Sequence, residues 1–260
     1  MIRFLFVIST GRSGSHYLSE VFKHVAGCAS FHEPWPTLND APMRAYLRGD
    51  PQPLRTLMPG KLAAMERERA GEPVYVETNH AFIKGFGWLL PEFIPESEMG
   101  VIVLRRGREA LLDSLQRVHC SPFNVWGHRW IITPAADPGL VALPAGFSHP
   151  LARFYVYRTL ETVLFRPLRV LSRGRYRKPA VVRRYERALL AWYLEQTEAL
   201  TERYRARFPG VRMVETDLAE LNDPAGLARL LEAFGLQALP SLAEQLGQRT
   251  NLKLEASRQP

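Results

Sequence analysis

The stretch FLFVISTGRSGSHYLSEVF, residues 4–22, decides the fold of this chain. Its apolar start predicts a buried strand over residues 3–8, and a helix is expected over residues 15–23. Gly11 and Gly14 lie in the turn between them and let the backbone approach a ligand closely. Free N–H groups and the dipole at a helix start attract anions, so this turn is predicted to hold a phosphate or sulfate group.

Three further apolar, β-branched runs, at residues 73–77, 100–104 and 211–215, have the composition of buried parallel strands. Helical segments lie between or after them, of which the clearest spans residues 180–208 and ends at Pro209-Gly210. Asp223 and Pro224 are expected to open another helix as its N-cap and first residue. This alternation predicts one domain over residues 1–260 with an α/β fold, in which helices flank a central, mostly parallel sheet in three layers. The many prolines and glycines of residues 122–150 predict an irregular excursion, extending over about 120–178.

The chain carries 34 Lys and Arg against 26 Asp and Glu, a formal net charge of +8, which favours anionic partners. The excess is concentrated in residues 166–187, which are expected to form either a solvated basic face or a docking surface for an acidic acceptor or an anionic membrane. Cys28 and Cys120 are too few for a disulfide framework or a four-thiolate metal site, so a reducing, cytoplasmic compartment is expected. No apolar run approaches the roughly 20 residues that span a bilayer.

The loop TGRSGSHYL, residues 10–18, resembles the 5′-phosphosulfate loop of sulfotransferases that use 3′-phosphoadenosine-5′-phosphosulfate (PAPS). The Arg12-Ser13-Gly14 core is similar to the arginine version found in carbohydrate and tyrosylprotein members. The resemblance implies a P-loop NTPase-like fold, PAPS as donor, the desulfated nucleotide (PAP) as product and no metal. It implies that Arg12 contacts the leaving phosphate, and that His16 stands where a hydroxyl residue is usual. The donor-binding residues that it implies here are Gly11, Arg12, Ser13, Gly14, Ser15, His16 and Tyr17, although Tyr17 fits a core position equally well.

A second motif, GVIVLRRGREALLDSL at residues 100–115, is a strand followed by two arginines and a helix. It resembles the 3′-phosphate motif of the same family, in which an arginine at the strand end is followed about eight residues later by a serine. Arg106 lies eight residues before Ser114 and Arg105 lies nine before it, so both arginines stay candidates. An arginine at a strand tip and a hydroxyl two helical turns later can bind one phosphate together.

A base must take the acceptor's proton, and Glu33 and His80 are the leading candidates. Glu33, in SFHEPWP, follows the first helix, where carbohydrate and tyrosylprotein sulfotransferases place a glutamate proposed as base, and the adjacent His32 is a competitor for the same task. In VYVETNHAFIKGF, Glu77, Asn79 and His80 end the second predicted strand, and His80 is placed like the catalytic histidine of cytosolic sulfotransferases. The arginine-type loop favours Glu33, and Lys84 is a weaker candidate for neutralising the sulfuryl group.

The leading interpretation is therefore a sulfotransferase that acts on a hydroxyl of a small molecule, glycan or lipid. A small-molecule kinase of related fold would need the Walker lysine and a Ser or Thr on magnesium, which the loop lacks. A non-catalytic binder of nucleotides or polyanions through residues 166–187 is the other alternative. No nucleic acid is expected, because the aromatic-interleaved patterns of RNA-binding modules are not seen. The sequence leaves the acceptor and the oligomeric state open.

Overall fold

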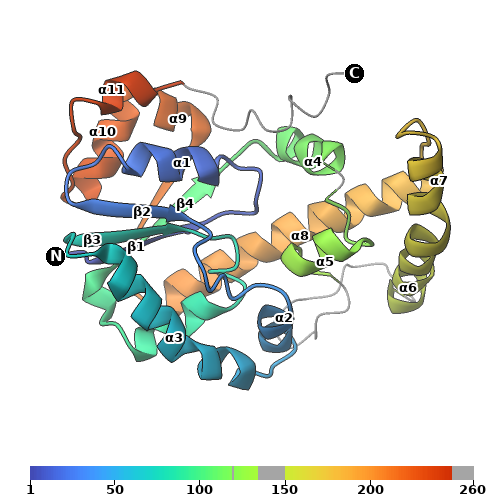
Figure 1. Ribbon diagram of the computed structural model, residues 1–260, viewed down its shortest axis with the longest axis horizontal. Helices are drawn as coiled ribbons and strands as arrows, with labels where there is room; N and C mark the ends of the chain where they lie inside the picture. Colours follow the sequence, from blue (N-terminus) through green and yellow to red (C-terminus); the bar gives the residue numbers. More distant parts are fainter. Residues whose placement is uncertain (119, 134–149, 248–260) are drawn as a thin grey trace.

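Five parallel strands form one sheet in the computed structural model, which describes residues 1–118, 120–133 and 150–247. The strands are β1 (Phe4–Ile8), β2 (Cys28–His32), β3 (Val74–Thr78), β4 (Met99–Arg105) and β5 (Arg212–Asp217). Their order across the sheet is β2-β3-β1-β4-β5, and every pair is parallel (Figure 1). All five carboxyl ends therefore lie at the same edge of the sheet, with β1 in the middle.

Helices cover both faces of this sheet, which confirms the predicted three-layer α/β fold. The first face packs against α1 (Ser15–Phe22), α9 (Leu218–Asn222), α10 (Pro224–Ala233) and α11 (Leu242–Gln245). The second packs against α2 (Ala41–Leu47), α3 (Gln52–Arg69), α4 (Arg108–Arg117) and α8 (Ala180–Arg207). Successive side chains of β1 point to opposite faces, so Phe4, Phe6 and Ile8 join one core while Leu5 and Val7 join the other.

The elements predicted from hydrophobic patterns are confirmed with small shifts of their ends. The four predicted strands correspond to β1, β3, β4 and β5, and the helices predicted at residues 15–23 and 180–208 correspond to α1 and α8. Asp223 caps α10 by accepting a hydrogen bond from the Gly226 N–H at 2.9 Å, and Pro224 is its first residue. Strand β2 was not predicted, because its sequence CASFH has few β-branched residues and it pairs with β3 alone at the edge of the sheet.

The prediction of an irregular excursion over residues 120–178 is wrong for much of its length. The chain forms α5 (Val125–Trp130), α6 (Pro150–Leu160), a π-helical turn η4 (Glu161–Phe165) and α7 (Arg166–Leu171) there. Pro150 and Pro167 do not break these helices because they occupy first-turn positions, where proline is tolerated. Residues 134–149 of the predicted excursion lie outside the described residues.

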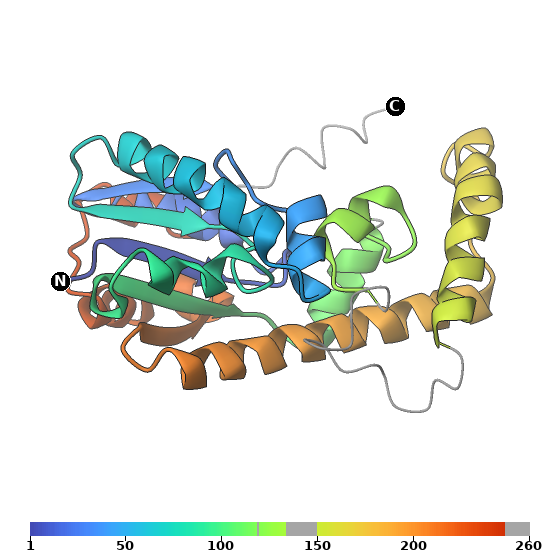
Figure 2. The ribbon, with the colours of Figure 1, turned by 90° about the horizontal axis from the view of Figure 1, so that it is seen from below.

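The segments α6, η4 and α7 form an arm at the far end of α8, away from the sheet (Figure 2). A small separate core of Phe123, Phe154, Phe165, Val182, Tyr185 and Leu189 joins the arm to α8. Short 3-10 turns η1 (Phe86–Trp88), η2 (Leu90–Glu92) and η3 (Glu96–Glu98) connect β3 to β4. Within the described ranges, no helix has the length and apolar character needed to cross a membrane.

Candidate functional site

The loop between β1 and α1 has a left-handed backbone at three positions. Gly11, Arg12 and Gly14 have φ values of 75°, 60° and 101°, and Gly14 is the N-cap of α1. A side chain at Gly14 would be strained by this φ, and its Cβ would lie 2.9 Å from a methyl group of Leu218. The loop therefore requires glycine for its shape, and it leaves the first N–H groups of α1 directed away from the helix, as an anion site needs.

Side chains beneath the loop hold this shape. The hydroxyls of Thr10 and Ser13 lie 3.0 Å apart, and the Ser13 hydroxyl also donates to the Gly11 carbonyl at 3.3 Å. Tyr193 of α8 donates its hydroxyl to the Thr10 carbonyl at 2.8 Å. Ser13 is buried at 1% exposure and does not line the cavity that the loop faces. The structure thus shows the Ser13 hydroxyl bonded inside the loop, and its predicted contact with a donor stays a prediction.

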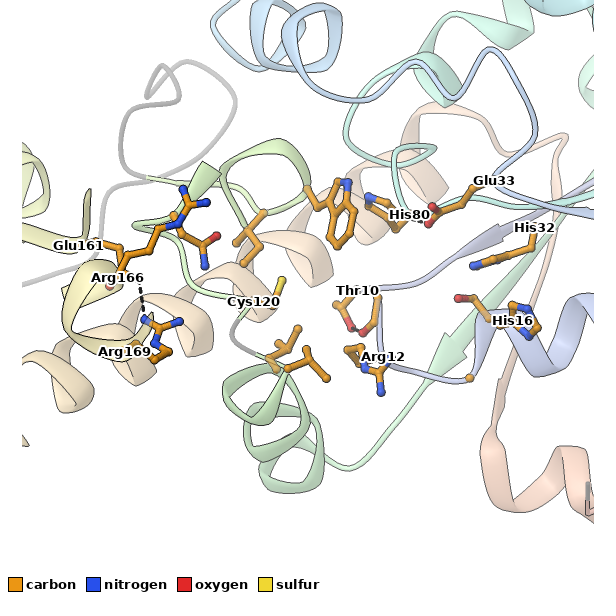
Figure 3. A pocket seen from close by; sticks show the side chains of 18 residues that line it. Thr10, Arg12, His16, His32, Glu33, His80, Cys120, Glu161, Arg166 and Arg169 are labelled. Atoms are coloured by element: carbon orange, nitrogen blue, oxygen red, sulfur yellow. Dashed lines mark hydrogen bonds and ion pairs between the residues drawn. The ribbon is translucent and has the colours of Figure 1, made fainter. Parts of the chain in front are cut away.

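A cavity of about 470 Å³ lies in front of the loop at the carboxyl edge of the sheet (Figure 3). Its walls come from six parts of the chain, namely the β1–α1 loop, the segment after β2, the segment after β3, the end of α4, the α5 region and the arm. Figure 3 shows Glu33 beside His80 on one side and Arg166 and Arg169 on the other. The lining residues that the sequence analysis singled out are Gly11, Arg12, Gly14, Ser15, His16, Glu33 and His80.

Tyr17 lies away from this cavity. Its ring is buried in the core between the sheet and α1, and its hydroxyl accepts a hydrogen bond from the Gly247 N–H at 3.3 Å. Of the two positions considered for Tyr17, the structure shows the core position.

Arg105 and Arg106, which the sequence could not separate, have different surroundings. The Arg105 guanidinium is paired with Glu198 of α8 and with Glu215 of β5, and these carboxylates raise its pKa. Arg106 instead donates to the Arg12 carbonyl at 2.5 Å. Arg106 is therefore the arginine that contacts the loop.

Ser114 is the second residue that meets the loop, because Arg12 donates from Nε to its hydroxyl at 3.4 Å. Arg12, Arg106 and Ser114 are thus brought together from the segments after β1 and β4. Arg12 lines the cavity, whereas Arg106 and Ser114 lie behind it.

The loop has an excess of positive charge. Burial lowers the pKa of Arg12, and the nearby cations Arg106 and Arg117 lower it further. Among the residues with described positions, neither Arg12 nor Arg106 has a carboxylate within ion-pair distance. The Nδ1 atom of His16 is buried and makes no hydrogen bond to any residue that the structure describes. Two uncompensated cations and an unused ring nitrogen form a suitable environment for an anion.

Glu33 and His80 form a hydrogen-bonded pair on the opposite wall. Glu33 follows β2 with a left-handed φ of 50°, and its backbone N–H donates to the Thr78 carbonyl at 3.1 Å. His80 Nδ1 lies 2.5 Å from Glu33 Oε1. The carboxylate side chain is 29% exposed, whereas the imidazole is 7% exposed, so Glu33 is the more accessible partner.

The pKa values of this pair indicate an ionised glutamate beside a neutral histidine. Burial lowers the pKa of His80 and nearby Lys84 lowers it further, against the opposing effect of Glu33. Burial alone would raise the pKa of Glu33, but the hydrogen bond that its carboxylate accepts from His80, together with nearby Lys84, outweighs this effect, and the pKa falls. His80 therefore donates from Nδ1, and its Nε2 is left as an acceptor, buried and without a partner among the described atoms.

Lys84 lies beneath the cavity and does not line it. Its ammonium group donates to the Trp130 carbonyl and to the Tyr193 hydroxyl, the latter at 3.3 Å. Burial lowers the pKa of Lys84 to about 7. Lys84 thus connects α5 and α8 behind the loop. It supports the wall of the cavity and does not contact the cavity directly.

Glu77, expected at the functional edge, belongs instead to a buried ion pair. Lys61 of α3 donates to Glu77 Oε1 at 2.8 Å, and both side chains are at most 1% exposed. Tyr75 and Asn79 each donate to the same carboxylate at 2.8 Å. Asn79 also fixes the chain before His80, because its side-chain oxygen accepts from the Ala81 N–H at 2.9 Å. This network positions His80 from below.

The basic residues 166–187 are only partly a solvated face. Arg169 and Lys178 are each 2.8 Å from the buried Glu161, and Arg187 is paired with Glu109 and Asp113. Arg166 and Arg169 line the cavity described above, a role that the charge of the segment alone could not reveal. A second hollow of about 800 Å³ lies next to the cavity, and its basic lining residues are Arg117, Arg169, Arg177, Lys178, Arg183, Arg184 and Arg187.

The sequence analysis gave His32 only a minor place, but it also lines the cavity. Its Nδ1 lies 2.8 Å from the Thr78 hydroxyl, and its ring meets the His16 ring edge-on with 5.1 Å between centroids. Burial lowers the pKa of His32. In the sequence, only the position of His32 directly before Glu33 indicated that it would lie at the cavity.

No group of three or more His, Cys, Asp or Glu side chains with the geometry to hold a metal ion occurs in the described ranges. Comparison with known proteins finds no protein-family model and no curated protein that matches this chain. The fold and the site together define a three-layer α/β protein with a candidate anion site and a carboxylate–imidazole pair at the carboxyl edge of its sheet.

Proposed function

We propose that this protein transfers a sulfuryl group from PAPS to a hydroxyl of an acceptor molecule. One observation carries the proposal: cationic and proton-accepting residues come from different halves of the same sheet edge. Arg12, Glu33 and His80 line one cavity there, and Arg106 contacts the loop behind it. Arg12 and Arg106 follow β1 and β4, whereas Glu33 and His80 follow β2 and β3. This division suits a reaction in which an anionic donor and a hydroxyl acceptor approach from two sides.

The residues around the loop fit an anionic nucleotide donor. The cavity lies where the connections after β1 and β4 go to opposite faces of the sheet, α1 to one and α4 to the other. Ligands of open parallel sheets bind at such a point. The N–H groups at the start of α1, the Arg12 guanidinium and His16, which lines the cavity, would hold the phosphosulfate. Arg106 and Ser114 would hold the 3′-phosphate.

When bound, PAPS supplies a sulfuryl group on a phosphate leaving group. In the transfer, a bond forms between the acceptor oxygen and sulfur, the bond from sulfur to the bridging oxygen breaks, and PAP leaves with the negative charge. Arg12 stabilises that charge, as buried cations aimed at a leaving group do. Glu33 takes the acceptor's proton because it is the ionised and more exposed member of its pair, and His80 holds its carboxylate in place.

The kinase alternative receives less support from the same residues. Walker-type phosphoryl transfer needs a lysine on the loop, but Ser15 and His16 follow Gly14 here. Lys84 does not substitute for it, because its ammonium group is directed to Trp130 and Tyr193.

A thermal-melting assay with nucleotides tests the proposal without knowledge of the acceptor. We expect 3′,5′-ADP, the product PAP, to raise the melting temperature more than 5′-AMP or ATP at equal concentration. A ligand at one hundred times its Kd stabilises a protein by about 2.7 kcal/mol, which gives a clear shift. Equal responses to ATP and 3′,5′-ADP would contradict the donor assignment.

A further inference from the structure

The arm α6–η4–α7 has an exposed apolar stripe. Six large apolar residues occur on it as three adjacent pairs at intervals of eight and seven residues, namely Tyr155 and Val156, Val163 and Leu164, and Val170 and Leu171. Seven or eight residues make about two helical turns, so the pairs lie near one side of the arm. The other side holds Phe154 and Phe165, which are buried against α8. The stripe is well exposed, with 64% for Val163 and 80% for Leu171.

The same segment is strongly basic at its surface. Its exposed cations include Arg153, Arg166, Arg173, Arg175 and Arg177. Glu161 is the only acidic residue between positions 150 and 178, and it is 2% exposed and paired with Arg169 and Lys178. The outer surface of the arm therefore combines apolar side chains with positive charge that nothing acidic on the arm balances.

We propose that this arm docks the protein onto the surface of an anionic lipid bilayer. The apolar stripe would enter the boundary between headgroups and acyl chains, and the arginines would meet the lipid phosphates, as in other interfacial helices. A second copy of the chain fits the stripe less well, because two arms packed face to face would bring their arginines together. The arm projects from the end of the molecule opposite the sheet, so a flat surface can reach it (Figure 2).

Docking would also orient the candidate site. Arg166 and Arg169 belong to the arm and line the cavity, so docking of the arm would bring the cavity close to the membrane surface. The docking itself does not depend on the proposed sulfuryl transfer, and it can be measured without a donor.

Cosedimentation with lipid vesicles tests the docking. We expect binding to vesicles of phosphatidylcholine mixed with phosphatidylserine and little binding to phosphatidylcholine alone. The variant Leu171→Asp/Arg175→Glu should lose more than about fivefold in affinity for the anionic vesicles. Each basic residue near such a surface contributes about fivefold to the affinity, and the variant also removes an apolar side chain. The matched control Leu57→Asp/Arg67→Glu changes an exposed leucine and an exposed arginine of α3 by the same net charge, and it should bind as the unmodified protein does.

Three outcomes would overturn the docking proposal. The first is no sedimentation with anionic vesicles, and the second is an equal loss in the α3 control. The third is unchanged binding of both Leu171→Asp and Val163→Asp, which would show attraction by charge alone without insertion of the stripe. Sedimentation velocity without lipid adds a check: a dimer that Leu171→Asp/Arg175→Glu dissociates would assign the stripe to a second copy instead.

Discussion

Replacing Arg106 by alanine should weaken the binding of 3′,5′-ADP, whereas the same change at the adjacent Arg105 should not. In the proposed site Arg106 would donate to the 3′-phosphate, and a hydrogen bond between charged groups contributes about 1.5–3 kcal/mol. Its loss corresponds to a Kd about 10- to 150-fold higher. Arg106 also donates to the Arg12 carbonyl at 2.5 Å, so its removal loosens the loop and moves the expected effect toward the upper end.

Arg105→Ala is the matched control for this prediction. It removes the same type of side chain one residue earlier, but the interactions that it removes are the ion pairs of Arg105 with Glu198 and Glu215. The three side chains are 36%, 47% and 44% exposed, and ion pairs at such positions contribute about 0–1 kcal/mol each. Arg105→Ala should therefore lower the melting temperature slightly and leave the affinity for 3′,5′-ADP unchanged.

Isothermal titration calorimetry with 3′,5′-ADP and with 5′-AMP separates the two phosphates. Arg106→Ala should affect 3′,5′-ADP strongly and 5′-AMP much less, because only the first ligand carries the 3′-phosphate. The reverse ranking of the two arginine variants, or normal 3′,5′-ADP binding by Arg106→Ala, would refute the reasoning.

Three further predictions concern the base and the buried charges. Glu33→Gln should keep 3′,5′-ADP affinity but lower single-turnover transfer from labelled donor by about 10²–10⁴-fold; a larger loss in His80→Asn would make His80 the base. Lys61→Met leaves Glu77 buried and unpaired, so urea denaturation should show a loss of about 3–5 kcal/mol, and a loss below about 1 kcal/mol would contradict this. Burial lowers the pKa of Lys84 to about 7 from 10.5, so between these pH values the unfolded chain holds a proton that the folded chain lacks. Stability should therefore rise with pH across this window, by up to about 1.4 kcal/mol per pH unit, relative to Lys84→Met in the same denaturation assay.

The sequence predicted the parts of the fold that repeat a simple pattern. Four apolar runs with helices between them were sufficient for a parallel sheet and for the loop at its edge. It did not predict β2, whose short sequence has no β-branched residue and which pairs with β3 alone. The arm was also missed, because proline and glycine frequency does not show that Pro150 and Pro167 stand in first turns.

The site residues illustrate a second limit. Sequence spacing could not choose between Arg105 and Arg106, because adjacent residues at a strand end point in different directions, and the carboxylates of α8 and β5 that bind Arg105 lie far along the chain. Likewise, Glu33 and His80 were treated as rival bases, whereas in the structure these residues, 47 positions apart, form one hydrogen-bonded pair. The parallel register that pairs His32 with Thr78 brings the two segments together, and no local pattern contains that information.

This register has a consequence for the proposed reaction. Across the sheet the order β2-β3-β1-β4 places Glu33 and His80 after the first two strands, and Arg12 and Arg106 after the next two. Changes to the pair after β2 and β3 should therefore act on the acceptor's proton, while changes to the arginines should act on the donor. In 3′,5′-ADP binding, Glu33→Gln and Arg106→Ala should combine additively, because distant groups without shared partners do so. A strong coupling between them would mean that the two halves of the cavity bind one ligand together, and the division of roles proposed here would be wrong.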